Sequence, residues 1–355
     1  MTTIRDSAHR YEDWLSKQLD GDVIVQDLAH KHDKMCESAF VFLRATYWRW
    51  SEIILDVCPD LAGAAQVLGV GDIHLENFGT WRDVDGRLAW GVNDFDEAAR
   101  MPYALDLVRL AASALLGRGR RAVSDQEICT AILQGYRQGL QAPRAVVLDR
   151  DVQWLRELVV VPEAERTKFW KKLAATKSKR APERYRKAIA DAMPQPRLTI
   201  STAPRRAGTG SLGRPRWVGT AEWRGAPVLR EAKALVVSAW SRARDSNDRT
   251  IRCSEIANGR FRPVDPWYRV KNGVVVRRLS PNNRKIEVGD GSSRLLDRDV
   301  LQMMGFELAN IHLGTARRQD AIKRDLEKRK RGWLTANARK AAEATTQDYK
   351  AWLAD

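Results

Sequence analysis

The sequence predicts an α+β fold in which helices alternate with short antiparallel strands. Two dipeptides, Asp85-Gly86 and Asn272-Gly273, separate runs of apolar and aromatic residues. Such dipeptides adopt the positive φ angles of two-residue turns, so each is expected to close a β-hairpin. Apolar residues at helical intervals predict helices over much of the remaining chain. The expected hairpins pair 78–81 with 88–92 and 267–270 with 274–279.

Other elements follow from the same kinds of pattern. The segment Ser124-Asp125-Gln126-Glu127 resembles a capping box, and it opens a helix that is expected to end near Leu140. The aromatic residues between Ala39 and Trp50 are expected to pack in the core. Further strands are expected at 66–71, 217–223 and 227–232, and further helices within 8–35, 104–116, 150–193, 235–244, 294–315 and 317–355.

The composition is that of a folded, soluble and strongly basic protein. The 355 residues are 44% hydrophobic and 30% charged, which excludes a disordered chain, and the formal net charge is +16. A basic surface attracts nucleic acid, anionic membranes or anionic small molecules, and charge alone does not choose among them. The four cysteines are scattered, so we expect reduced thiols. No apolar run is long enough to span a membrane and the N-terminus lacks an apolar core, which predicts a cytoplasmic location without a membrane partner.

The first hairpin is expected to bring a set of reactive side chains together. Asp72 and Asn77 lie at the entry of its first strand, and Asp94 lies at the exit of its second. Phosphoryl transfer from a nucleotide needs one carboxylate to accept a hydroxyl proton, and an amide oxygen and a second carboxylate to hold Mg²⁺. Asp72 fits the first role. Asn77 and Asp94, with Asp96 as a further candidate, fit the second, although such residues also occur in hairpins as turn formers and solvated charges.

These motifs resemble a known group of enzymes. The pattern Asp-x-His-x-x-Asn, followed after a hairpin by Asp-Phe-Asp, resembles the catalytic and metal loops of aminoglycoside phosphotransferases and other kinase-like small-molecule kinases. The resemblance implies that Asp106 braces the catalytic loop from a helix. The fuller string, with Gly-Asp-Ile-His, Asn-Asp-Phe-Asp-Glu and Asp-Leu-Val-Arg-Leu-Ala-Ala-Ser, resembles the bacterial family catalogued as domain of unknown function 2252.

Three residues near these motifs have further interpretations. His74, counted with Asp72 in the catalytic loop, is expected to support the loop by hydrogen bonding, and without a nearby Cys or second His a zinc site is not expected. Arg44 is a cation in an apolar run, which indicates either the rim of the active site or a buried structural ion pair. Arg109 shares a helix face with Asp106 and is expected to be able to pair with it.

A second motif, Gly208-Thr209-Gly210-Ser211-Leu212-Gly213, has glycine spacing that lets backbone N–H groups approach phosphate oxygens. Such strings also occur in plain turns and in dinucleotide-binding folds. Here strands are expected on both sides, which is the arrangement of a kinase glycine-rich loop and not of a strand–helix turn. Gly208, Thr209, Gly210, Ser211 and Gly213 are therefore the expected phosphate-binding residues.

A kinase small lobe also needs a cation to bind the nucleotide phosphates. This cation is expected on the second of the two strands that follow the glycine-rich loop, at 227–232. The candidates are Arg230 and Lys233. In the resembling family a lysine precedes Glu-Ala, which places Arg230 at that position and leaves Lys233 as the substitute. Glu255 is a candidate acidic partner for the cation. The segment from Arg278 to Pro281 is the expected hinge against which adenine would stack.

The order of the two motifs is the reverse of that in ordinary kinases, where the glycine-rich loop comes first. The resemblance therefore implies a protein-kinase-like two-lobed fold, circularly permuted, with a mostly helical large lobe and a small antiparallel-sheet lobe. The expected parts are the catalytic half of the large lobe at 1–195, the small nucleotide-binding lobe at 196–282 and the C-terminal helices at 283–355.

The leading functional hypothesis is an ATP- and Mg²⁺-dependent phosphotransferase acting on a small molecule or protein with a hydroxyl group. Two alternatives remain. The same fold could transfer AMP or bind a nucleotide with little catalysis, or the chain could be a basic nucleic-acid-binding or scaffold protein that uses residues 168–187 and the tail. A polycationic acceptor would need an acidic pocket, for which Glu76, Asp96 and Glu97 are candidates.

Overall fold

The structure is a computed structural model that describes residues 2–119, 121–149, 151–244, 246–284, 287–288 and 294–354. It is a mixed α+β fold with small antiparallel sheets. Its α-helices are α1 (Ile4–Gln18), α2 (Val25–Met35), α3 (Ala39–Ala45), α4 (Tyr47–Val57), α5 (Tyr103–Gly117), α6 (Asp125–Gln141), α7 (Gln153–Leu158), α8 (Glu163–Ala174), α9 (Glu183–Asp191), α10 (Ala239–Ala243), α11 (Cys253–Ala257), α12 (Arg298–Gly314), α13 (Gln319–Lys328) and α14 (Trp333–Ala354). Short 3₁₀ turns lie at Pro59–Leu61, Leu75–Asn77 and Arg294–Leu296.

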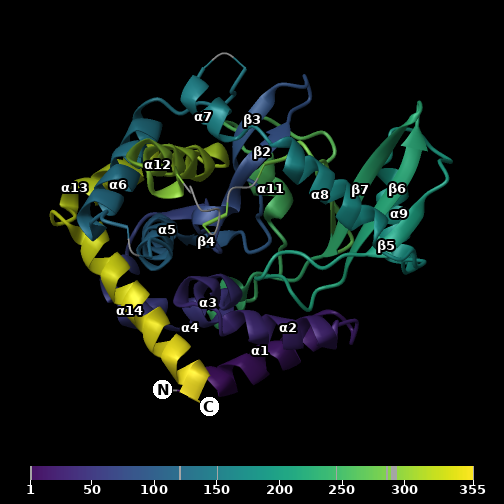
Figure 1. The fold of residues 1–355 in the computed structure, drawn as a ribbon. Coiled ribbons are helices and arrows are strands. Elements are labelled where there is room, and N and C mark those ends of the chain that lie inside the picture. The colour runs from purple at the N-terminus through teal and green to yellow at the C-terminus, as the bar shows by residue number, and fades with distance from the viewer. Residues whose placement is uncertain are drawn as a thin grey trace.

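The described strands form three sheets, and every pairing is antiparallel. The largest sheet has the order β5-β6-β7-β9-β8, while β1 pairs with β4 and β2 pairs with β3. In Figure 1 the labelled strands β5, β6 and β7 stand with α9 on one side of the molecule, away from α6, α12, α13 and α14. The strands are β1 (Gln66–Gly69), β2 (Phe78–Arg82), β3 (Leu88–Val92), β4 (Ala99–Pro102), β5 (Ser201–Pro204), β6 (Arg216–Trp223), β7 (Ala226–Ala234), β8 (Arg269–Lys271) and β9 (Val274–Arg278).

Both predicted hairpins are present, as β2–β3 and β8–β9. At the second turn Asn272 has φ 50° and Gly273 has φ 68°, so both central residues adopt the left-handed backbone that this turn requires. The predicted capping box of α6 is also present, because Ser124 and Glu127 each accept from the other's backbone N–H. Local chemistry therefore fixed the positions of these elements.

Helices α6 and α12 pack unusually closely through glycine. A Cβ atom added at Gly305 would overlap the carbonyl of Ile132, and one added at Gly135 would overlap the carbonyl of Gln302. The two backbones can approach only because these positions lack side chains. Helix α12 also contacts β1 and β3, the strands before and within the first motif.

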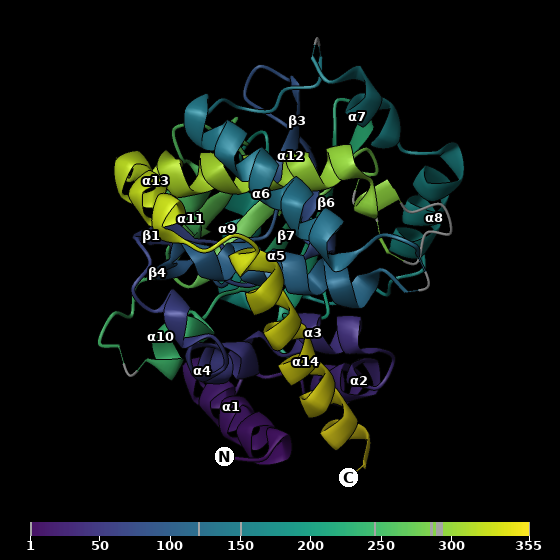
Figure 2. The same cartoon turned by 90° about the vertical axis from the view of Figure 1, so that its left-hand side faces the viewer.

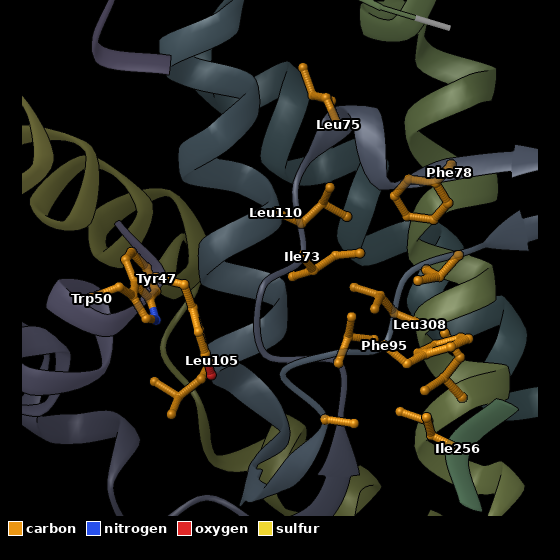
Figure 3. Packing of buried hydrophobic residues seen from close by; sticks show 14 of the residues in the cluster. Tyr47, Trp50, Ile73, Leu75, Phe78, Phe95, Leu105, Leu110, Ile256 and Leu308 are labelled. Atoms are coloured by element: carbon orange, nitrogen blue, oxygen red, sulfur yellow. The ribbon is translucent and has the colours of Figure 1, made fainter. Parts of the chain in front are cut away.

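The hydrophobic core runs from the helices into the five-stranded sheet. Figure 3 shows how the loop segments of the first motif are fixed in it, since their apolar side chains point inward between α5 and α12. Burying alternate residues of an irregular segment holds its polar residues at the surface of the core. The labelled core residues of this region are Tyr47, Trp50, Ile73, Leu75, Phe78, Phe95, Leu105, Leu110, Ile256 and Leu308.

Several expectations about elements were wrong in detail. Strand β1 ends at Gly69 and pairs with β4, a four-residue strand that was not predicted. The helix expected at 235–244 shortens to α10, because the backbone N–H of Leu235 still bonds to the carbonyl of Gly273 beside the sheet. The region 150–193 contains three short helices, α7 to α9. The lobe boundaries predicted at 195 and 282 stay predictions.

The two ends of the chain lie together. Figures 1 and 2 both place the N and C labels at the same end of the molecule, where α1 meets α14. The guanidinium of Arg5 donates to the carbonyl of Trp352 at 2.8 Å and lies 4.4 Å from its ring centroid. In the described part of the chain, no helix has both the length and the apolar character needed to cross a membrane.

Candidate functional site

Asp106 on α5 fixes the entry of the first motif. Its carboxylate accepts from the backbone N–H groups of Val70 at 2.7 Å and Gly71 at 2.9 Å. His312 Nε2 of α12 lies 3.0 Å from Asp106 Oδ2, the oxygen that also accepts from Val70. Gly71 has φ 79°, and the carboxylate holds the loop in this sharp turn so that the next residue, Asp72, leaves the core. This is the bracing role that the resemblance implied.

Asp72 is held by a buried arginine. Arg109 is 1% exposed and donates to Asp72 Oδ1 at 2.5 Å and to the carbonyl of Leu43 at 2.8 Å. Arg109 therefore pairs with Asp72, while Asp106 binds the loop backbone, so the pairing suggested by their helical spacing was wrong. Burial raises the pKa of Asp72 above its ordinary value, although the guanidinium of Arg109 opposes the rise. A carboxylate with a raised pKa accepts a proton more readily.

Asn77 links the catalytic loop to the segment after the hairpin. Its amide nitrogen donates to the backbone carbonyl of Asp72 at 2.9 Å and, weakly, to that of Asp94 at 3.5 Å. The 3₁₀ turn at Leu75–Asn77 directs this side chain, which is 5% exposed. With the nitrogen engaged by the protein, the amide oxygen is the atom left to accept from, or coordinate, a bound group.

Asp94 and Asp96 form a charged pair with Lys233 of β7. Lys233 Nζ lies 3.4 Å from Asp94 Oδ1 and also contacts Asp96 Oδ2. Burial alone would raise the pKa of Asp94, but Lys233 and Arg277 lower it well below its ordinary value. Burial and repulsion from Asp94 raise the pKa of Asp96. Among the described residues no cluster of three or more His, Cys, Asp or Glu side chains is arranged to hold a metal by itself.

The glycine-rich loop and the catalytic loop line one cavity. Gly208, Thr209, Gly210 and Ser211 share it with residues of the first motif, including Asp72, His74, Asn77, Asp94 and Asp96. A Cβ at Gly210 would lie 3.0 Å from Asp72 Oδ2, so only glycine lets the backbone come this close without crowding the carboxylate. The two motifs therefore meet despite their distance in the sequence. Gly213 instead turns toward α2, where a Cβ would overlap Leu28.

Helix α2 holds the glycine-rich loop from outside, a feature that sequence reasoning missed. The carbonyl of Gly213 accepts from the N–H of Ile24 at 3.0 Å, and the carbonyl of Gly210 accepts from Lys31 Nζ at 3.1 Å. Arg206, just before the loop, pairs with Asp27 at 2.6 Å. These contacts tie the loop along its whole length to the N-terminal helices.

Lys233, and not Arg230, contacts the two aspartates that follow the first hairpin. Successive residues of a strand point to opposite faces, so Glu231 and Lys233 share the face opposite to Arg230. Arg230 donates to the carbonyl of Ala192 at 2.7 Å and lies 4.2 Å from the ring centroid of Trp267. Arg230 therefore does not lie where the family resemblance placed it, as the cation on this strand that would bind phosphates. The two acidic partners of Lys233 are the aspartates after the hairpin.

Three arginines that the sequence reasoning missed surround the carboxylate of Glu231. Arg216 lies 3.0 Å from it, Arg277 lies 2.8 Å from it, and Arg205 also contacts it. Glu231 is 1% exposed. Burial and the repulsion between these cations lower the pKa of Arg205 and of Arg216. Glu231 is thus shared by three guanidinium groups, and the charges of Asp94 and Asp96 also act on Arg216.

This arginine cluster, Arg205, Arg216 and Arg277, lines a second cavity of about 340 Å³. The second cavity also contains the predicted hinge residues Arg278, Leu279 and Ser280. It meets the first cavity at Asn77, Asp94 and Gly208, which line both. Arg205 follows β5, Arg216 begins β6 and Arg277 lies in β9. Only the register of the sheet shows that these three arginines lie on one face.

The remaining candidates have structural partners. Arg44 lines the first cavity and pairs with Glu76 at 2.6 Å, so both interpretations of it, rim residue and buried ion pair, describe its position. Glu255 lies on α11, where it contacts Arg252 at 3.1 Å, and it is not the partner of Lys233. His74 is 7% exposed and lines the first cavity.

The sequence of the chain matches the model of a protein family. The bacterial family domain of unknown function 2252, described as an uncharacterized protein conserved in bacteria, matches residues 24–201 and 199–355. The chain belongs to this family. Both matched segments contribute residues to the site. The first segment contributes Asp72 to Asp96, and the second contributes the glycine-rich loop and Lys233. Comparisons with curated proteins and with solved structures found no match.

Proposed function

We propose that this protein is an ATP- and Mg²⁺-dependent phosphotransferase for a hydroxyl-bearing acceptor. The observation that carries the proposal is the pair of cavities that meet at Asn77, Asp94 and Gly208. One of them holds the carboxylate of Asp72, and among the described residues that line the other, arginines outnumber carboxylates. Phosphoryl transfer needs this arrangement, with the base on one side of the transferred group and the phosphate-binding charges on the other.

The second cavity is the proposed nucleotide site. Phosphate oxygens would take the unused hydrogen bonds of the arginine cluster and of Lys233, with the backbone of the glycine-rich loop above them. Binding a polyanion there would offset the repulsion that now lowers the pKa of Arg205 and Arg216. The adenine ring would lie toward Arg278 to Ser280, which line the same cavity.

Asn77 and Asp94 fit a magnesium ion bound together with phosphates. Mg²⁺ is usually held by one or two protein oxygens, waters and substrate phosphates, so a larger acidic cluster is not required. The amide nitrogen of Asn77 donates to the protein backbone, so its amide oxygen can coordinate the ion. The side chain of Asp94 is 35% exposed. The ion would neutralise phosphate charge; Asp96 would stay with Lys233 and Arg214, which lies 3.6 Å from it.

Asp72 would act on the acceptor. Arg109 holds Oδ1, so Oδ2 is the oxygen that accepts the proton as the acceptor hydroxyl attacks the γ-phosphorus. The new bond joins the acceptor oxygen to phosphorus, and the bond between phosphorus and the bridging oxygen breaks, releasing ADP. Asn77 keeps the Asp72 backbone in place during this step.

The element order supports a protein-kinase-like two-lobed fold in circularly permuted order. The catalytic loop comes first, the sheet with the glycine-rich loop follows, and α12, which contributes His312 to the bracing of Asp106, comes last. In this proposal α12 corresponds to the helix that precedes the catalytic loop in ordinary kinases. Arg5 of α1 and Trp352 of α14 are in contact, so a permuted order that joins these two helices would not disturb the core.

The test compares two cations on opposite faces of β7. Binding of a non-hydrolysable ATP analogue with Mg²⁺ is measured by calorimetry for Lys233→Met and for the matched control Arg230→Met. We expect Lys233→Met to weaken binding by about tenfold or more, and Arg230→Met to leave it within about twofold. In Asp94→Asn the affinity should no longer depend on Mg²⁺. Equal effects of the two strand variants, or no binding by the wild type, would refute the proposed nucleotide site.

Labelled ATP separates phosphoryl transfer from AMP transfer on the same site. With label at the γ position, a phosphotransferase passes the label to its acceptor. With label at the α position, only transfer of AMP does so. Label transferred from the α position alone would replace our proposal by the adenylyl-transfer alternative.

A further inference from the structure

Each carboxylate that lines the cavity on the Asp72 side has a basic partner within the protein. Asp72 is paired with Arg109 at 2.5 Å, Glu97 with Arg214 at 2.5 Å, and Glu76 with Arg44 at 2.6 Å. Asp94 and Asp96 share Lys233, and Lys31 adds a further buried cation beside Gly210. The described charged residues that line the cavity are the carboxylates Asp72, Asp94, Asp96 and Glu97 and the arginines Arg44 and Arg214, and Arg109 and Lys233 pair with these carboxylates from just outside it.

This pairing argues against a polycationic acceptor. Glu76, Asp96 and Glu97 were the residues expected to provide an acidic pocket, and each is occupied by an arginine or lysine of the protein itself. A polyamine would have to displace these buried partners, which costs several kcal/mol for each pair that is broken. A multiply charged anion is also disfavoured, because the arginines near this cavity and Lys233 are already paired with carboxylates of the protein.

The uncharged part of the wall includes aromatic rings, one of them a tryptophan whose indole N–H is unpaired among the described residues. Trp48 is 3% exposed and lines the cavity, and its indole N–H has no hydrogen-bond partner among the described residues. Its ring stacks on that of Tyr11 with the centroids 5.3 Å apart and the planes inclined by 15°. Buried N–H groups are nearly always satisfied, and an indole can only donate, so the missing partner is an oxygen acceptor such as a hydroxyl or ether.

The cavity is also small. It encloses about 50 Å³, and the backbone of Gly210 closes it close to Asp72 Oδ2. At about 10–15 Å³ for each water-sized probe, this is room for a group of only a few heavy atoms. A compact molecule, or the compact end of one, fits beside Asp72.

We propose that the acceptor is a compact, uncharged polyhydroxylated molecule, bound with one oxygen at the indole N–H of Trp48 and one hydroxyl at Asp72. This inference rests on the proposed phosphotransferase function and narrows its substrate class. Tyr11 and Trp48 cover the carbon skeleton, and Asp72 receives the proton of the hydroxyl that is phosphorylated. The paired charges around the site hold their positions because a neutral acceptor competes with none of them.

The experiment measures transfer of label from γ-labelled ATP, with Mg²⁺, to a panel of acceptors. The panel contains the neutral polyols glycerol, myo-inositol and glucose, the polycations kanamycin and spermidine, and a serine-containing peptide. We expect label on at least one polyol and on neither polycation. The Trp48→Phe variant keeps the ring and removes the N–H, so it should raise the polyol KM by about 5- to 15-fold and leave the KM for ATP unchanged.

Trp333→Phe is the matched control. Trp333 on α14 is 7% exposed and also has a buried indole N–H without a partner among the described residues, but it does not line the cavity. The same chemical change there should leave both KM values unchanged. Transfer to kanamycin, spermidine or the peptide in preference to every polyol would overturn the inference. So would equal polyol KM values in Trp48→Phe and the wild type, or ATP binding without transfer to any polyol, whereas a failure to bind the ATP analogue would refute the proposed function itself.

Discussion

Lys31 is a buried cation whose removal should stabilise the fold and weaken nucleotide binding. It is 3% exposed, and its ammonium donates to the carbonyl of Gly210 and lies 5.5 Å from the ring centroid of Tyr11. In a trans peptide the carbonyl and the following N–H point in opposite directions. By holding the carbonyl of Gly210 toward α2, Lys31 directs the N–H of Ser211 away from α2, where a phosphate oxygen could accept from it.

The stability effect follows from the pKa of Lys31. Burial, aided by repulsion from Arg214, lowers this pKa from 10.5 to about 8. At about 1.4 kcal/mol for each pKa unit, keeping the buried ammonium protonated costs the folded state about 3 kcal/mol below pH 8. Methionine has a similar shape and no charge, but it gives up a hydrogen bond worth about 1 kcal/mol. We therefore expect Lys31→Met to raise the free energy of unfolding by about 2 kcal/mol at pH 7.

The same two pKa values of Lys31 fix how the stability difference between the wild type and Lys31→Met changes with pH. Between pH 8 and 10.5 the unfolded chain binds the Lys31 proton and the folded chain does not, so wild-type stability rises with pH relative to the variant. The advantage of Lys31→Met is complete below pH 8 and shrinks above it. The titratable and charged groups that act on Lys31 are Glu12, Asp72, Glu97 and Arg214, with Tyr11 beneath it.

Urea unfolding at pH values from 7 to 9.5 measures this difference, with Lys34→Met as the control. Lys34 lies on the same helix, is 37% exposed and pairs with Glu37 at its surface, so its loss should change stability by less than about 0.5 kcal/mol. The affinity of Lys31→Met for the ATP analogue should fall several-fold. A variant that is less stable than the wild type at pH 7, by an amount independent of pH, would refute the reasoning.

Two further predictions concern the frame of the site. Asp106→Asn places an amide where two backbone N–H groups donate, so we expect a loss of about 2–4 kcal/mol in unfolding free energy and reduced turnover; unchanged urea unfolding and turnover would show that Gly71 does not depend on this carboxylate. Gly305→Ala forces a methyl group into the carbonyl of Ile132 and should cost about 3 kcal/mol or more, measured by thermal unfolding. A Cβ at Gly63 would meet nothing within 4 Å, so Gly63→Ala should be nearly neutral, and equal losses in the two glycine variants would contradict the close packing of α6 on α12.

Much of the local structure could be read from the sequence. The hairpins at Asp85-Gly86 and Asn272-Gly273 and the cap at Ser124 depend on residues within a few positions of each other, and all three are present. The first hairpin closes through a longer loop than the predicted two-residue turn, because Asp83 pairs with Arg87 and, of the two central residues, only Gly86 has a positive φ. The two motifs were also located by residue type and spacing alone. Whether they would meet was a question of tertiary structure, and in the fold Asn77 and Ser211 line one cavity.

The choice between Arg230 and Lys233 shows where sequence reasoning ended. Both are cations three residues apart on one strand, and a one-residue change of register exchanges the faces to which they point. The pairing of Lys233 with Val275 fixes that Lys233, and not Arg230, lies on the side of Asp94 and Asp96, and no local pattern contains that information.

The sequence by itself determined the turns, the helix cap and the chemical types available to the site, because these depend on short-range backbone sterics and on residue identity. The tertiary structure alone decided which charges face each other. Arg205, Arg216 and Arg277 gather on Glu231, and Lys31 reaches Gly210, only after the sheet register and the docking of α2 are set. Buried charges select their partners through space within a few ångströms, and a linear sequence does not record that proximity.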